Sequence, residues 1–255
     1  MRVVSSGVTA LALMASLAAS GACQQFDVTS VKVSERSTPG TASAGSGMQN
    51  PTWYSARYST LSQLIRKAYE LEDYQLSGGP SWLGSDRFDV DGRTTSGTAP
   101  ADMLMMLRTL LKDRFGLKAH FETKSIEANV LTVAPGGPKI SPKFHPTSQS
   151  GSDIANLKST LDAIAFPAMT LKRFTFYLRL NMTHDPETNQ PIKPEDVLPV
   201  LDQTGLTGTY DIILNGNSHE SWPASVEHQF GLRLETRKAS IQVLTVDAAS
   251  KPSLN

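Results

Sequence analysis

The chain has 255 residues, of which 39% are hydrophobic and 19% are charged, proportions typical of globular proteins and too apolar for a disordered one. Its 24 basic residues balance its 24 acidic residues. Without a basic excess to neutralise phosphates, the composition argues against a nucleic-acid-binding protein. The length allows one large domain or two small ones.

The first 22 residues predict a secretory signal peptide. Arg2 gives a minimal positive start, residues 8–19 form a short apolar run, and Ser20-Gly21-Ala22 supplies small residues for cleavage. The run is too short to cross a bilayer, and no later segment approaches the roughly 20 apolar residues that crossing requires. We therefore expect an exported protein, periplasmic or extracellular, with no transmembrane segment after signal removal.

Cys23 is the only cysteine, so the fold cannot contain an internal disulfide. Two interpretations of its position remain open. Ordinary cleavage after Ala22 leaves a free thiol at the mature N-terminus, whereas lipoprotein processing attaches a lipid to Cys23 and anchors the protein to a membrane. A lipoprotein signal usually has Leu three residues before the cysteine, and Ser20 stands there.

Residues 23–50 predict a first strand followed by a flexible arm. Residues 26–33 read as a strand. Residues 34–50 are rich in Ser, Thr, Gly and Ala, a composition typical of loops.

Residues 51–145 and 161–255 predict two diverged copies of one small unit, joined by a linker over residues 146–160. Each copy opens with an amphipathic helix directly after a threonine, Thr60 in the first and Thr170 in the second. The threonine hydroxyl can accept a hydrogen bond from a free backbone N–H of the first helical turn.

A strand and a second helix follow in each copy. Residues 87–91 alternate between polar and apolar side chains and match residues 209–213. The helix expected over residues 99–115 has a shorter counterpart over residues 222–230.

Each copy is expected to end in a helix-to-strand turn and a β-hairpin. Gly116 and Gly231 each follow a Phe, where glycine can end a helix in the left-handed conformation. Polar residues near 123–124 and 237–238 predict the two hairpin turns. The predicted fold class is α+β, with two diverged copies of a helix–strand–helix–hairpin unit whose helices pack on small, mainly antiparallel sheets.

Several motifs together resemble one protein family over nearly the whole mature chain. They lie at residues 26–32, 77–83, 86–90, 113–118, 122–124, 136–139, 202–211 and 251–253. They resemble the soil-associated exported proteins of soil bacteria, a family with a domain of unknown function. The resemblance implies export, many paralogues per genome, and relatives joined to membrane metallopeptidase sensors. It implies no assigned activity and no site residues.

A serine-hydrolase site would need a nucleophile on a tight Gly-x-Ser-x-Gly turn. The nearest match centres on Ser81, but Leu83 stands where the second glycine belongs. A turn that Trp82 anchors to the core is the favoured interpretation.

Two metal sites can be considered. His219, Glu220, Glu227 and His228 offer zinc donors, but Pro223 stands where a second histidine one helical turn after His219 would be needed. We favour solvated residues around a short helix.

A calcium loop is the second consideration, because carboxylates at alternating positions can converge on a hard cation. Asp86, Asp89, Asp91 and Gly92 provide such a pattern. The apolar residues between them are typical of a half-buried strand instead, so no metal, cofactor or catalytic residue is predicted.

The favoured function is a non-catalytic extracytoplasmic binding or protein-interaction module for an unknown protein or cell-envelope ligand. Trp53, Trp82 and Trp222 are the candidate contact residues. The alternatives are an exported hydrolase with an unfamiliar site and a sensory partner of membrane peptidases.

Overall fold

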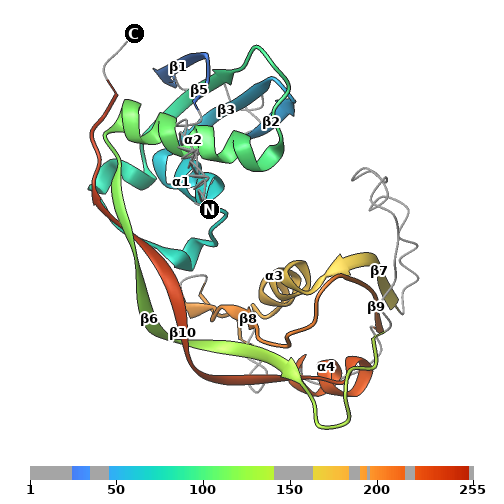
Figure 1. The fold of residues 1–255 in the computed structure, drawn as a ribbon. Coiled ribbons are helices and arrows are strands. Elements are labelled where there is room, and N and C mark those ends of the chain that lie inside the picture. The colour runs from blue at the N-terminus through green and yellow to red at the C-terminus, as the bar shows by residue number, and fades with distance from the viewer. Residues whose placement is uncertain are drawn as a thin grey trace, which may run out of the picture. The chain divides into compact units, whose positions relative to one another are not determined.

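The computed structural model describes residues 25–34, 46–140, 163–183, 190–193, 196–215 and 222–252. The predicted signal peptide, Cys23, the linker, His219 and Glu220 lie outside these residues. Within them the fold is mixed α+β, with four α-helices and several small sheets (Figure 1). None of the helices in this part of the chain has the length and apolar character to cross a membrane.

The chain divides into two compact units. Of the described residues, unit 1 contains 25–34, 46–72, 78–119 and 246–252, and unit 2 contains 73–77 and the described part of 120–245.

Unit 1 is built on a four-stranded antiparallel sheet in the order β1-β5-β3-β2. Its strands are β1 (Val28–Val33), β2 (Ser46–Asn50), β3 (Trp53–Thr60) and β5 (Arg87–Arg93). Its helices are α1 (Leu61–Tyr69), the 3-10 turn η2 (Ser81–Gly84) and α2 (Pro100–Phe115). Strand β2 lies within the segment expected to be a flexible arm, and it forms because Ser46–Asn50 pairs with β3.

The core of unit 1 forms between α1, α2 and the inner face of the sheet. Thr60 caps α1 as predicted, because its hydroxyl accepts from the Gln63 amide while the Gln63 side chain accepts from the Thr60 amide. The Phe88 and Phe115 rings meet edge to face at 5.1 Å. The largest fully buried side chains of the unit are Tyr54, Leu61, Leu64, Ile65, Phe88, Met103, Leu107, Leu111 and Phe115.

Unit 2 contains a two-stranded antiparallel sheet and parts of a second sheet in the order β4-β10-β6-β8. The elements are η1 (Asp73–Gln75), β4 (Leu76–Gly78), β6 (Lys118–Val133), β7 (Ala163–Thr170), α3 (Leu171–Asn181), β8 (Val200–Asp202), β9 (Thr209–Asn215), α4 (Trp222–Phe230) and β10 (Leu232–Ala248). Strand β7 pairs antiparallel with β9, and β6 pairs parallel with β8. Thr170 caps α3 by accepting from the Arg173 amide, as predicted.

The two expected hairpins are not present. The polar residues near 123–124 and 237–238 lie inside the continuous strands β6 and β10, which are 16 and 17 residues long. Around the expected turns, residues 120–126 and 235–241 contain no Gly, Pro, Asn or Asp, which are residues that favour a tight turn. The two strands pair with each other instead.

A β-bulge occurs at the same place in both units. The residue Tyr58 in β3 and the residue Ala168 in β7 have φ of 51° and 50°, in the left-handed region that side chains other than glycine disfavour. In each case an aspartate on the paired strand accepts from the bulged amide. Asp89 Oδ1 lies 2.8 Å from the Tyr58 nitrogen, and Asp211 Oδ1 lies 3.1 Å from the Ala168 nitrogen.

Candidate functional site

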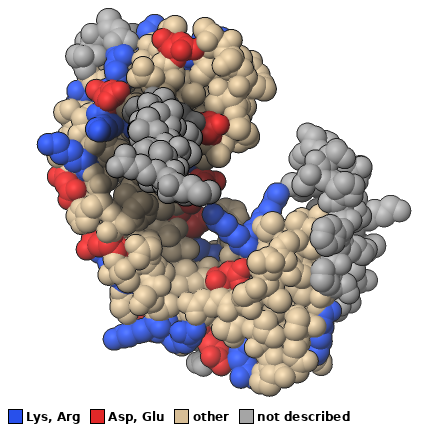
Figure 2. All heavy atoms as spheres, in the orientation of Figure 1, with Lys and Arg blue, Asp and Glu red and all other residues tan. Residues whose placement is uncertain are grey.

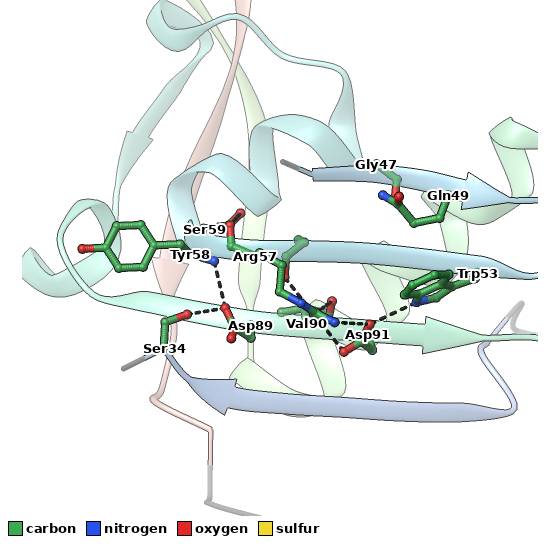
Figure 3. A network of polar contacts seen from close by, with 11 residues as sticks. Ser34, Gly47, Gln49, Trp53, Arg57, Tyr58, Ser59, Asp89, Val90 and Asp91 are labelled. Atoms are coloured by element: carbon green, nitrogen blue, oxygen red, sulfur yellow. Dashed lines mark hydrogen bonds and ion pairs between the residues drawn. The ribbon is translucent and has the colours of Figure 1, made fainter. Parts of the chain in front are cut away.

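The outer face of the unit 1 sheet carries the network of polar contacts drawn in Figure 3. Side chains alternate along a strand, so the buried Phe88 and Val90 of β5 face the core. Their neighbours on β5 and the facing positions of β3 project to the other side. We call the set Trp53, Arg57, Asp89, Asp91 and Arg93 the outer sheet face.

Asp91 is at the centre of this face. Its carboxylate receives two bonds from the Arg57 guanidinium, at 2.9 and 2.8 Å, and a third from the Trp53 indole nitrogen at 3.0 Å. Partial burial raises the pKa of Asp91, but the hydrogen bonds from Arg57 and Trp53 together outweigh it and lower the pKa overall. The hydrogen bond to Asp91 in turn raises the pKa of Arg57.

Guanidinium groups stack on two aromatic rings at opposite ends of β5. Arg93 lies 4.5 Å from the centre of the Trp53 ring, and Arg87 lies 4.9 Å from the centre of the Tyr58 ring. Arg87 also donates to the Tyr58 carbonyl at 3.2 Å. Each stack contributes about 0.5–1 kcal/mol where it is exposed, which favours the observed ring orientations.

The residues considered for calcium have separate partners. Asp89 accepts from the Ser34 hydroxyl as well as from Tyr58, and Asp86 is ion-paired with Lys251 at 2.7 Å. A Cβ on Gly92 would lie 2.7 Å from the Phe26 ring, so this glycine makes room for a packed ring. Among the described residues, no group of three or more potential metal ligands comes together.

Trp82 lies in unit 1 against the C-terminal segment. Its ring packs edge to face on Phe88 at 6.2 Å, and the Lys251 ammonium lies 5.8 Å from its centre. The hydrogen bond from Lys251 lowers the pKa of Asp86. These contacts give a structural role to Trp82 and Lys251, which belong to the motifs that begin at residues 77 and 251.

The suspected nucleophile turn has the geometry of a structural turn. Ser81 is exposed at the start of η2, and Leu83 is buried where the second glycine of a nucleophile turn would stand. Gly79 has φ of 84°, and a Cβ there would lie 2.7 Å from Leu83. The glycine is therefore needed for packing.

Sequence reasoning missed a serine–lysine pair in unit 2. The Lys124 ammonium donates to the Ser77 hydroxyl at 3.1 Å and is ion-paired with Glu122 at 3.0 Å. The Thr245 hydroxyl lies 2.9 Å from Ser77 and donates to Glu122; that bond, followed by the one from Lys124, lowers the pKa of Glu122. Two family motifs contain Ser77, Glu122 and Lys124, but only the structure shows that these residues meet each other and Thr245.

Of the residues considered for zinc, the structure describes Glu227 and His228. Glu227 accepts two bonds from the Arg233 guanidinium, at 3.2 and 3.1 Å, and this lowers the pKa of Glu227. Lys139 donates to the His228 carbonyl at 2.9 Å. Trp222 is the first residue of α4, and the arrangement of its side chain lies outside what the structure describes.

A family model described as "Protein of unknown function (DUF3738)" matches residues 62–249. The match extends from α1 to β10 and leaves out β1, β2 and all of β3, including Trp53. Comparison with curated proteins and with solved structures gave no match.

Proposed function

The chain belongs to the DUF3738 family of unknown function, and from this premise we propose that it is an extracytoplasmic, non-catalytic binding or protein-interaction module. The proposed contact surface is the outer sheet face. One observation carries the proposal: the partly exposed Trp53 indole is hydrogen-bonded to Asp91 and stacked by Arg93.

The chemistry of this surface suits recognition. Trp and Arg are the residue types that contribute most to binding energy when they are held rigid before contact. Arg57 is partly exposed, and so is Asp91, so a ligand can reach their remaining hydrogen-bonding positions. Of the titratable groups of the face, Arg57 and Asp91 are paired with each other, and Asp91 also accepts from the Trp53 indole, which positions the aromatic ring.

Thermal unfolding with a ligand panel tests this proposal. The chain from Gln24 on is heated with cell-wall fragments, peptides, sugars, calcium and zinc in turn. A ligand present at about 100 times its Kd adds roughly 2.7 kcal/mol to the free energy of unfolding. We expect one class to raise the Tm, and Trp53→Ala and Arg93→Gln each to weaken that rise.

Phe121→Ala is the matched control, because Phe121 is half exposed and lies in unit 2. It should leave the ligand-dependent rise in Tm unchanged. A rise that persists in both Trp53→Ala and Arg93→Gln would place the contact surface elsewhere and refute the proposed site.

Export and gene duplication are part of the proposal. The signal-like first 22 residues support a periplasmic or extracellular location, with a lipid on Cys23 as the alternative to a free thiol. The matching bulges of Tyr58 and Ala168 and the matching Thr caps support two diverged copies of one unit.

An exported hydrolase is the second candidate, favoured by the contact between Ser77 and Lys124. A lysine that activates a serine must take the hydroxyl proton, whereas Lys124 here donates to Ser77 and is paired with Glu122. Incubation with a fluorophosphonate probe separates the two functions: covalent labelling that Ser77→Ala abolishes would favour the hydrolase.

A sensory partner of membrane peptidases is the third candidate, and it rests on the family resemblance. Deletion of the gene should alter peptidase signalling if this function is correct. Unchanged signalling in the deletion strain would remove it.

A further inference from the structure

Helix α3 of unit 2 has an apolar stripe on its solvent side. Phe176 is 48% exposed and Leu180 is 57% exposed, and residues four apart lie one above the other on a helix. The opposite side of α3 packs on β7 and β8 through the buried residues Leu171, Phe174 and Leu178. The stripe is thus separate from the packing side.

The charges on α3 are all of one sign. The helix contains Lys172, Arg173 and Arg179 and no acidic residue. Arg179 is ion-paired with Asp73 at 2.9 Å. Within the described part of the chain, no ion pair engages the exposed Lys172 and Arg173, which lie one turn before Phe176 and on either side of the stripe.

The single sign of charge on α3 contrasts with the composition of the chain. The chain as a whole has a net charge of zero, and Figure 2 shows acidic and basic side chains interspersed over the face in view. We call Lys172, Arg173, Phe176 and Leu180 the α3 outer face.

We propose that the α3 outer face makes a reversible contact with an anionic lipid surface. Phe and Leu side chains on a helix enter the boundary between headgroups and acyl chains, while neighbouring Lys and Arg side chains bind anionic headgroups. A partner helix would instead require a groove to receive it, and the α3 outer face is the convex surface of a single helix. The contact is independent of the outer sheet face.

Vesicle co-sedimentation tests the contact. The chain from Gln24 on retains every described residue and lacks Cys23, so a lipid on that cysteine cannot contribute. We expect it to sediment with phosphatidylglycerol vesicles and to stay in solution with phosphatidylcholine vesicles. The double variant Lys172→Gln, Arg173→Gln should weaken partitioning into these vesicles about thirtyfold. Each cation near an anionic surface contributes about fivefold to sixfold to the partition coefficient, and the variant removes two cations.

The contribution of the apolar side chains to lipid binding is tested by the double variant Phe176→Ser, Leu180→Ser, which should weaken partitioning about tenfold. Both double variants should fold, because the side chains are exposed and the Thr170 cap uses the Arg173 backbone amide. The matched control is Met105→Ser with Lys112→Gln, which removes a similarly exposed apolar side chain and a cation from α2. It should partition like the unaltered chain.

Three results would overturn the proposal. The first is equal sedimentation with both lipids, and the second is partitioning that survives both α3 double variants. The third is a concentration-dependent dimer in solution that the Phe176→Ser, Leu180→Ser variant abolishes, because a second copy would then be the occupant of this face.

Discussion

At the scale of single residues, Asp91 links the stability of unit 1 to pH. Its folded-state pKa is lowered, so the carboxylate stabilises the fold above the unfolded pKa of about 3.9 and loses this contribution as pH falls through the folded value. Asp91→Asn removes the charged partner of Arg57 and should lower the free energy of unfolding by about 1–2 kcal/mol near pH 7. Urea unfolding at neutral and acidic pH measures both effects.

The difference between Asp91→Asn and the unaltered chain should shrink as pH falls below the unfolded pKa of about 3.9 and through the lower folded pKa of Asp91. Asp113→Asn is the control, because Asp113 is an exposed carboxylate on α2. A constant difference at every pH would show that the Asp91 charge does not stabilise the folded state.

Two helix-ending glycines differ in what surrounds them. A Cβ on Gly231 would overlap the backbone carbonyl oxygen of Gly137, whereas a Cβ on Gly116 would meet only the Ser250 hydroxyl, at 2.9 Å. Both glycines have positive φ, 64° and 55°. We expect Gly116→Ala to cost about 1 kcal/mol and Gly231→Ala to cost about 3 kcal/mol or more, measured by urea unfolding. Equal costs would contradict the backbone clash.

At the scale of elements, the bulge in β7 stores strain at Ala168. Replacement of Ala168 by Gly should raise the free energy of unfolding by about 0.5–1 kcal/mol, because glycine adopts φ of 50° without a steric penalty. Ala101→Gly, in the first turn of α2, should have the opposite effect. Chemical denaturation of both variants and of the unaltered chain measures their free energies of unfolding. A loss of stability in Ala168→Gly would argue against strain at the bulge.

The helices and their ends could be predicted because local chemistry determines them. Thr60 and Thr170 cap their helices, and the helix expected over residues 222–230 is α4. The pairing of β6 with β10 could not be predicted, because contacts between residues more than 100 positions apart decide it.

The outer sheet face could be predicted only in part. Strand alternation placed Asp89 and Asp91 together on one side of β5, and Trp53 was a candidate contact residue. The partner Arg57 comes from β3 and the partner Ser34 directly follows β1, so the aspartates suggested a cation site where the fold supplies a guanidinium and a hydroxyl.

At the scale of the whole molecule, the C-terminal segment belongs to unit 1. The Ser250 amide donates to the Phe115 carbonyl at 2.7 Å, and the Ser250 hydroxyl bonds the same oxygen at 3.2 Å. Removal of residues 250–255 should destabilise unit 1 by about 1 kcal/mol and lower its Tm by about 4–8 °C. Differential scanning calorimetry measures the shift.

Lys251→Ala separates the side chain from the backbone contact. It removes the ion pair with Asp86 and leaves the Ser250 bonds intact, so its Tm should fall less than that of the truncated chain. An unchanged Tm after truncation would show that the segment does not stabilise unit 1.

The return of the C-terminus to unit 1 sets the order in which the protein can mature. A chain emerges from the ribosome with its N-terminus first, and Phe115 meets its partner Ser250 only after 135 further residues have been made. Unit 1 therefore lacks this contact until the end of synthesis, and a prematurely terminated chain never forms it.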